Sequence, residues 1–546
     1  MDGGLRSVSI YSDYSARSAF TSSCEPQPLM YAPSPAMFID LGVTRPSVSR
    51  PSRSAIHILD DDSLLKIFYF CRPGAFEQDQ YGLVRWGNWG RERWWYKPVQ
   101  VCRRWRYLIL ASASHLGLCL VCTRGTPVAD MLAHSPPFPL VIDYDYPKQD
   151  LAAEEEEGVM FALQHRDRVS RINLRMPVPG LQKVITALDD EFPMLEYLYI
   201  APPTKHNSRL ILPATFEAPQ LRLFILNHFA SPIGSPLLTT AVGLVILALR
   251  WIHPSTYPHP NHLLQPLSLL PQLETLDLSI GSPIPNREIE RQLSHIPIEA
   301  HVTLPNLHWF AFWGISAYFE AFLPHMTIPI LKRFRVQFFN QLRFSVPRLL
   351  QFMTVTENLR FSSVRFLFYH EAVAVFVGTR VGTEIEDFFL QVWCRHLDWQ
   401  VSSTAQIFNV LSPLLSAVAE LNLDYREHTL SSEGHNQADS TQWRGLLGSF
   451  RNVKTLRVHK GLVGELSRCL QLDGESSLDL LPELNELVCS AGSVDDKTFS
   501  AFSHEREAAG KPINLIVEVS PVNREVYLFI SSTGRYNIDS DPVLPR

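Results

Sequence analysis

Apolar residues recur in one short form along most of the chain. The form is an apolar residue, two further residues, an apolar residue, one residue and a third apolar residue. Twelve copies occur, and they are separated on average by about 29 residues, a period that suits one strand and one return helix per unit. The copies begin at Val169, Leu195, Leu221, Leu244, Leu273, Leu307, Leu331, Phe361, Ile385, Val418, Val453 and Leu484.

The segments between these copies have the features of helices. Residues 179–193 carry apolar residues at helical spacing, and residues 403–415 open with Ser403 and Gln406, which are spaced as in a capping box. Proline stands shortly before several copies, where it ends a helix and favours extended backbone. The apolar residues of the first segment are Leu181, Val184, Ile185 and Leu188.

One strand and one helix cannot bury their apolar faces alone, so units of this kind stack on one another. The pattern therefore predicts an α/β solenoid with a parallel inner sheet, and residues 140–142 read as a further buried strand before the repeats. The alternative is an ordinary α/β domain, because its strands also read as short apolar runs.

Two shorter apolar patterns precede the repeats and predict two helices. Residues 60–62 are acidic and suit the positive end of a helix dipole, and Pro98 suits the first turn of a second helix. In the second helix Arg103, Arg104 and Arg106 fall largely opposite the apolar side. The apolar residues are Leu64, Ile67, Phe68 and Cys71 in the first helix, and Val101, Cys102, Trp105, Leu108 and Ile109 in the second.

Residues 58–108 resemble an F-box. The stretch LLKIF at 64–68 is similar to the core of the family's first helix, and VCRRWR at 101–106 matches the motif of its later helix. The continuation and the divergent leucine-rich-repeat-like region look like the large fungal group of F-box proteins. Asp60 stands where the family has proline, and residues 72–97 form a long insert between the two halves.

The resemblance implies a non-catalytic function. An F-box docks on the Skp-type adaptor, and through it on a cullin, in an SCF ubiquitin ligase, while C-terminal repeats hold a protein substrate for ubiquitin-dependent degradation. The alternative for each residue that the resemblance assigns to the adaptor is packing inside the F-box itself. The implied adaptor-binding residues are Leu59, Leu64, Ile67, Phe68, Val101, Cys102 and Trp105.

The repeats depart from the regular leucine-rich pattern at their turns. That pattern has Asn or Cys three positions after the third apolar residue, whereas the twelve copies have neither, and Gly281, Gly461 and Gly492 occupy three of these positions. Irregular turns are therefore expected.

The chain is expected to divide into four parts. A disordered leader, rich in Ser, Pro, Tyr and Arg, occupies residues 1–54, and an F-box-like helical module with the insert 72–97 occupies 55–118. The leucine-rich-repeat-like solenoid spans 119–520, and a C-terminal tail spans 521–546.

Composition and charge point to a soluble intracellular protein of the cytoplasm or nucleus. The 546 residues carry a net charge of −6, which calls for neither nucleic acid nor an anionic membrane as a partner of the whole chain. The eight cysteines are sparse and irregularly spaced, which favours a reducing compartment. The N-terminus lacks a signal-peptide core, and the longest apolar run, 237–249, is too short to span a bilayer.

Other chemistry has weaker support in the sequence. Cys119 and Cys122 lack the further ligands of a zinc site and are expected to be buried thiols. Residues 85–106 interleave seven basic residues with six Trp or Tyr, which leaves nucleic-acid binding as an alternative to tryptophans that pack under the repeats. The acidic run at 154–157 reads as a solvated helix start. Enzyme and cofactor motifs are absent, so no catalytic residue, metal or cofactor is assigned.

The aromatic residues around 309–319 have two interpretations. They could anchor an interface, but packing between repeats is the expected role. The set comprises Trp309, Phe312, Trp313, Tyr318 and Phe319. A scaffold with a degenerate F-box, which binds a protein without ubiquitination, remains the main alternative to the ligase subunit.

Overall fold

A computed structural model describes most of the chain between residues 59 and 518. The leader 1–54 and the tail 521–546 lie outside the described residues, and the division into four parts stays a prediction. The chain separates into the units 1–60 and 61–546, and the elements below all belong to the second. The described residues are 59–72, 77–78, 84–85, 93–145, 152–202, 210–230, 232–252, 258–280, 297–339, 341, 343–356, 358–359, 361–378, 387–426, 438–470, 480–490 and 499–518.

The first elements of this unit are short helices, here called the helical module (residues 61–116). Both predicted helices form, but the second is broken, because Cys102 has extended backbone (φ −158°, ψ 169°) and caps the N-terminus of a new helix. Pro98 stands at the start of the preceding helix, as predicted. The elements are α1 (Asp61–Cys71), the antiparallel pair β1 (Glu77–Gln78) and β2 (Val84–Arg85), the 3-10 helix η3 (Trp94–Tyr96), α2 (Pro98–Val101), α3 (Arg103–Ala111) and α4 (Ala113–Leu116).

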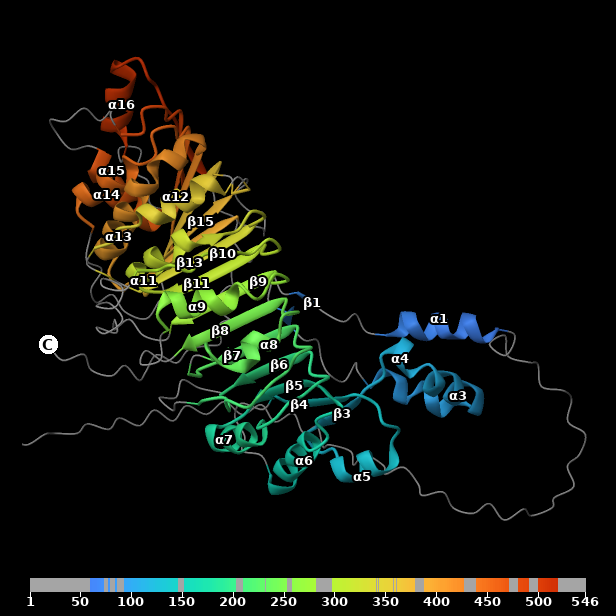
Figure 1. The fold of residues 1–546 in the computed structure, drawn as a ribbon. Coiled ribbons are helices and arrows are strands. Elements are labelled where there is room, and N and C mark those ends of the chain that lie inside the picture. The colour runs from blue at the N-terminus through green and yellow to red at the C-terminus, as the bar shows by residue number, and fades with distance from the viewer. Residues whose placement is uncertain are drawn as a thin grey trace, which may run out of the picture. The chain divides into compact units, whose positions relative to one another are not determined.

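Sixteen of the described strands form one large sheet (Figure 1). Each of the twelve sequence copies coincides with a strand, and so does the strand predicted at 140–142, so the α/β repeat fold with a large parallel sheet is confirmed. The strands are β3 (Leu120–Thr123), β4 (Leu140–Asp145), β5 (Val169–Arg175), β6 (Tyr197–Ala201), β7 (Leu223–Asn227), β8 (Ile246–Ile252), β9 (Thr275–Ile280), β11 (Trp309–Gly314), β13 (Arg333–Phe339), β14 (Ser363–Phe368), β15 (Ala372–Gly378), β16 (Phe388–Trp393), β17 (Glu420–Tyr425), β18 (Thr455–Val458), β19 (Glu486–Ser490) and β20 (Asn514–Glu518).

Helices return the chain between the strands and pack on one face of the sheet (Figure 1). They are α5 (Val128–His134), α6 (Ala153–Leu163), α7 (Val178–Ala187), α8 (Pro236–Thr240), α9 (Pro260–Leu267), α11 (Ser316–Phe322), α12 (Pro347–Val355), α13 (Leu397–Leu411), α14 (Ser440–Leu447), α15 (Val463–Leu470) and α16 (Ser500–Ala508). Between and beside them lie the 3-10 helices η5 (Leu323–His325), η6 (Ser412–Ala417) and η7 (Lys460–Leu462), and the parallel pair β10 (Val302–Thr303) and β12 (Met326–Thr327).

The core lies between this sheet face and the helices. On β11, Phe310 and Phe312 point to the helices, since their ring centroids lie 6.4 and 4.7 Å from that of Phe319 on α11. In the same way Phe366 on β14 meets Phe408 on α13, with centroids 5.2 Å apart. The last two apolar residues of a sequence copy thus supply the core, which is why the spacing predicted the strands.

The predicted capping box at Ser403 is wrong. Helix α13 begins at Leu397 with His396 at its N-cap, so Ser403 lies buried in the middle of the helix. The apolar positions continue back to Leu397, and burial of this longer stretch outweighs a local cap. Gln406 instead accepts a hydrogen bond from the backbone N–H of Phe344, at 2.9 Å.

The expected purely consecutive, parallel stacking is wrong around β15. The strand order there is β13-β16-β15-β14-β17, and β15 is antiparallel to both of its neighbours. The sequence AVAVFVG at 372–378 forms a strand where a return helix was expected, because its β-branched and apolar residues fit a buried sheet. A turn of three residues joins β14 to β15, and so short a link permits an antiparallel hairpin alone.

In the described part of the chain, no helix is long and apolar enough to cross a membrane. The apolar run 237–249 is divided between α8 and β8.

Candidate interaction surfaces

The helical module has a small core of motif residues. Leu64 and Phe68 of α1 are buried, and the edge of the Phe68 ring meets the half-buried Trp105 of α3, with centroids 5.0 Å apart. Leu108 and Ile109 are buried in α3 as predicted. Three of the seven residues assigned to the adaptor thus contribute to holding the two helices together.

Other apolar side chains of the module are exposed. Ile67 and Val101 are 43% and 61% exposed, and Phe70 and Tyr107, which sequence reasoning did not select, are 82% and 73% exposed. We call these four residues the exposed apolar set. Phe70 and Tyr107 could have been noticed, because each is a large ring at a helix position outside the predicted apolar face.

The buried faces of these helices are therefore narrower than the apolar faces that the sequence predicted. Val101 and Cys71 were placed on them, but both are exposed in the structure. Cys102 is half-buried at the break between α2 and α3. Leu59 is half-buried just before α1. The adaptor-binding role of all seven residues stays a prediction.

The tryptophan-rich segment before α2 ties into the first repeats. The buried Trp95 indole N–H donates to the carbonyl of Cys119 at 3.3 Å, and its ring lies edge-on to Phe138. Arg93 donates to the carbonyl of Val121 and to the Thr126 hydroxyl, at 3.2 and 2.9 Å. The Trp95 ring and the Arg93 guanidinium are thus engaged within the protein, whereas nucleic-acid binding would require such groups at the surface.

The Cys119–Cys122 pair consists of buried thiols. Burial raises the pKa of the Cys122 thiol to about 12, so the reactive thiolate is strongly disfavoured. Among the described residues, no group of three His, Cys, Asp or Glu side chains is placed to hold a metal ion.

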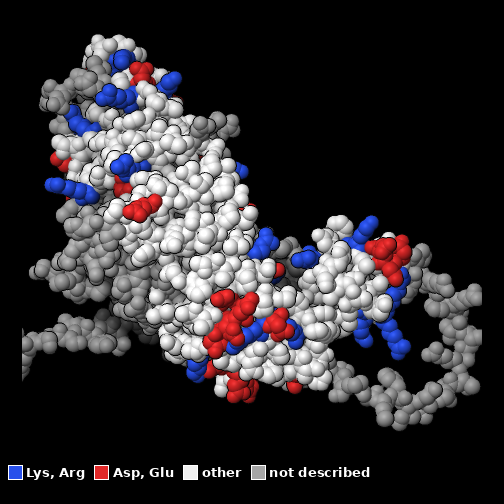
Figure 2. Space-filling model, viewed as in Figure 1, with Lys and Arg blue, Asp and Glu red and all other residues white. Residues whose placement is uncertain are grey.

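Charged residues gather over α6 and α7 and around the neighbouring strands, where Figure 2 shows acidic and basic side chains together. Glu155 pairs with Arg124 at 3.1 Å, and Glu156 pairs with Lys183 at 2.6 Å. The acidic run opens α6, as predicted. These pairs join successive repeats, which explains the patch without a ligand.

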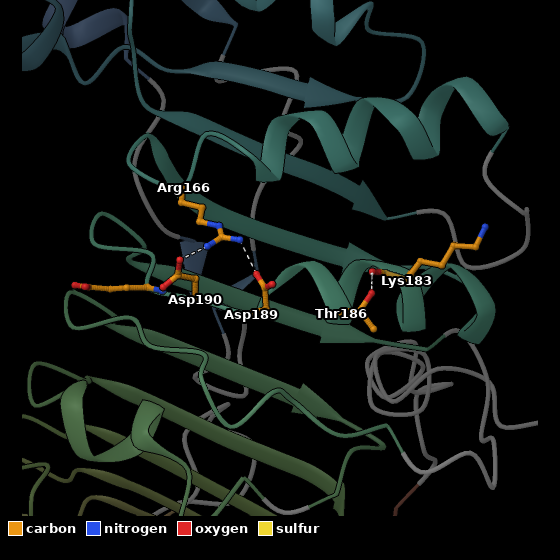
Figure 3. Close-up of polar contacts among 6 residues, drawn as sticks. Arg166, Lys183, Thr186, Asp189 and Asp190 are labelled. Carbon is orange, nitrogen blue, oxygen red and sulfur yellow. Dashed lines mark hydrogen bonds and ion pairs between the residues drawn. The ribbon is translucent and has the colours of Figure 1, made fainter.

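Arg166 makes a second link of this kind. Its guanidinium lies between the carboxylates of Asp189 and Asp190, which follow α7 (Figure 3). The N–O distance to Asp189 is 2.6 Å. Because these groups are at least one-third exposed, the pairs add little stability and mainly orient the loops.

The sheet face away from the helices, here called the open face, carries the alternate residues of every strand. Between β6 and β8 it is apolar and well packed. This patch consists of Tyr197, Leu223, Ile225, Ile246 and Ala248. The patch is continuous across three neighbouring strands.

Elsewhere on the open face, charges are paired across neighbouring strands. Such pairs among the described residues are Arg175–Asp145 at 3.9 Å, Arg250–Asp277 at 2.7 Å, Arg365–Asp424 at 2.6 Å and Arg457–Glu420 at 3.0 Å. Each joins strands that are adjacent in the sheet, so each serves as a cross-strand pair.

The aromatic residues of β11 and of the following helix α11 are divided between the two faces of the sheet. Phe312, Tyr318 and Phe319 are buried in the helix-side core, which agrees with the expected packing role. Trp309 and Trp313 lie on the open face instead, because strand residues alternate and Phe310 and Phe312 face the helices.

No protein-family model and no curated protein matches the chain. Among solved structures, the chain is similar to that of the TLR13–ssRNA13 complex, with 13% identity and a TM-score of 0.29 over 73% of this chain and 48% of that one. It is also similar to the leucine-rich repeat-containing protein LegL7 from Legionella pneumophila, with 12% identity and a TM-score of 0.25, over 73% of this chain and 99% of LegL7. The chain thus spans about half the length of the TLR13 chain.

Proposed function

We propose that the chain is the substrate-recognition subunit of an SCF ubiquitin ligase. The helical module docks on the Skp-type adaptor, and through it on a cullin, while the repeats hold a protein substrate. The chain contributes no catalytic group, and it accelerates ubiquitin transfer by bringing the substrate close to other subunits.

The observation that supports this proposal is the exposed apolar set. Ile67 and Phe70 lie on α1 and Tyr107 on α3, whose motif residues form the module's core, and Val101 ends the short helix α2 just before α3. Large apolar side chains that are exposed on a small module are candidates for protein contact, since burying them against a partner is favourable. The F-box-like motif specifies which partner class to test first.

The test is co-purification of the full-length chain with the Skp-type adaptor. Ile67→Asp and Val101→Asp each place a charge in the expected interface, and we expect each to weaken adaptor binding by at least about tenfold. Val355→Asp is the matched control, because Val355 is 76% exposed on α12, outside the module. Failure of the intact chain to bind the adaptor would overturn the ligase proposal.

The second candidate is an interaction scaffold with a degenerate F-box. Asp60 in place of proline and the insert 72–97 favour it. It predicts that the intact chain purifies without the adaptor but with a stable protein partner that variants of the open face release. Nucleic-acid binding through residues 85–106 would instead show affinity that falls steeply with salt.

A further inference from the structure

A histidine caps the N-terminus of α9. His259 is 6% exposed, and its Nδ1 atom accepts a hydrogen bond from the backbone N–H of Asn261 at 3.3 Å. Its Nε2 atom is buried and has no hydrogen-bond partner among the described residues. Because Nδ1 can accept only when it carries no proton, this cap requires the neutral form of the ring. Protonation would remove the cap and place a charge in a buried position.

Asn261, whose backbone donates to this cap, also holds the segment 297–304, here called the strap. The side-chain amide nitrogen of Asn261 donates to the carbonyl of Pro297 at 2.9 Å. The amide oxygen accepts from the backbone N–H groups of Glu299 and Ala300, at 3.0 and 3.3 Å. The first turn of α9 therefore fastens one end of the strap to the repeats.

A pair of histidines lies near the other end of the strap. The strap contains β10, which pairs with β12, and the backbone N–H of Leu304 donates to the carbonyl of Thr327 at 3.0 Å. His301 and His325 directly precede these two strands, and their ring centroids lie 4.6 Å apart. His325 is half-buried, and its Nδ1 atom is buried without a hydrogen-bond partner among the described residues. We call His259 and His325 the strap histidines.

The groups beside both strap histidines disfavour a further positive charge. His262, one turn further along α9, has its ring centroid 6.2 Å from that of His259. His301 and Arg348, the latter in the first turn of α12, act in the same way on His325. Burial lowers the pKa of His259 and of His325 below the ordinary histidine value, and these neighbours lower the pKa further.

The carboxylates of the surrounding elements do not offset these charges. Glu320 on α11 accepts hydrogen bonds from the backbone N–H groups of Arg348 and Leu349, at 2.7 and 2.9 Å, and so caps the start of α12. Burial raises the pKa of the Glu320 carboxyl, so this group can also gain a proton in the acid range. Glu299 of the strap is exposed. In the part of the chain that the structure describes, neither strap histidine forms an ion pair with an Asp or Glu.

We propose that the strap is an acid-sensitive latch, which neutral strap histidines keep closed and which their protonation releases from α9 and β12. In the opened latch both rings reach water and bind protons more readily, so acid favours opening. The latch is most stable above about pH 6.5, the ordinary histidine value, and loses stability as the pH falls from there toward the lowered pKa. Opening uncovers Val302 and Met326, which are 2% and 5% exposed in the closed state, so an apolar surface becomes dependent on pH. This inference goes beyond the ligase proposal and does not depend on it.

The experiment measures hydrogen–deuterium exchange of the full-length chain by mass spectrometry at pH 7.5 and pH 5.5. After correction for the intrinsic exchange rate at each pH, we expect protection of the strap to fall at least about fivefold at pH 5.5, the factor that loss of one N-cap contact produces. Peptides from β5 serve as the internal reference and should keep their protection. Equal protection of the strap at the two pH values, or a fall no larger than that in β5, overturns the proposal.

Variants assign the effect to the strap histidines. His259→Asn keeps a side-chain acceptor that suits an N-cap but does not titrate, and His325→Gln removes the second titrating ring. We expect each variant to reduce the pH-dependent loss of protection in the strap, and the double variant to bring it below about twofold. Full pH dependence in both single variants, or in the double variant, overturns the proposal. Because the single variants are measured separately, the proposal stays testable if the double variant does not fold.

Two control variants separate other titrating groups. His165→Gln removes a half-buried histidine that follows α6, outside the elements around the strap, and should leave the change in protection intact. Glu320→Gln removes the carboxyl that caps α12 and should also leave the pH dependence of the strap in place. Loss of this pH dependence in either control overturns its assignment to the strap histidines.

Discussion

The two faces of β11 differ although they belong to one strand. Phe310 and Phe312 point to the helices and pack against other aromatic rings. Trp309 and Trp313, their neighbours in sequence, share the open face with arginines, and their indole N–H groups have no acceptor among the described residues.

This difference indicates that aromatic residues have different roles on the two faces of the strand. On the helix side, burial accounts for Phe310 and Phe312, because both rings fill space between the sheet and the helices. On the open face, burial alone would favour aliphatic residues, which lack a polar atom to satisfy. The tryptophans there pack on one another and beside arginine side chains instead of filling a core.

The largest expected effect tests this comparison at adjacent positions. Phe312→Ala should lower the free energy of unfolding by about 3–5 kcal/mol, since it leaves a cavity in a buried cluster. Trp313→Ala should lower it by only about 1–2 kcal/mol, because Trp313 is half-buried and its unpaired N–H is removed with it. Equilibrium denaturation in urea measures both, and equal losses would show that the open face is a second core.

A smaller effect concerns the paired charges of the open face. Arg365 and Asp424 lie 2.6 Å apart on β14 and β17, two strands that become neighbours through the inverted order around β15. Both side chains are less than one-third exposed, so we expect a coupling energy of about 1–2 kcal/mol. A double-mutant cycle with Arg365→Ala and Asp424→Ala measures it. A coupling near zero would mean that this pair does not help to fix the inverted order.

The smallest expected effect is measured on the unchanged sequence. It tests how well solvent is excluded from the buried thiols on the helix side of the sheet. Burial raises the pKa of Cys122 to about 12 and that of Cys489 to about 11. At pH 8 the thiolate fraction is then about 0.01–0.1%, so alkylation by iodoacetamide should be at least about 100-fold slower than in urea. Peptide mapping by mass spectrometry reports each site, with the exposed Cys71 as the fast internal reference. Rapid labelling of Cys122 in the native chain would show that solvent reaches this side of the sheet.

The sequence predicted the repeat fold well because its signal is local. An apolar residue at the second and third positions of each copy must face a core, and twelve such copies each produced a strand. It also predicted where α1 and α2 begin, because acidic residues and proline act on the nearest backbone groups.

The helical module shows where local signals stop. Periodicity placed Val101 on a buried face, but the extended backbone at Cys102 separates α2 from α3 and leaves Val101 exposed. The packing of α1 on α3 determines which apolar residues of the module stay exposed. The sequence of neither helix alone predicts this packing.

The sequence by itself determined the repeating unit, the composition of the helix-side core and the two helical halves of the module. The tertiary structure alone decided that β15 lies between β14 and β16, since the run AVAVFVG does not by itself specify which strands become its neighbours. It likewise gave the reason for Gly461, where a Cβ atom would lie 2.7 Å from the Tyr425 ring.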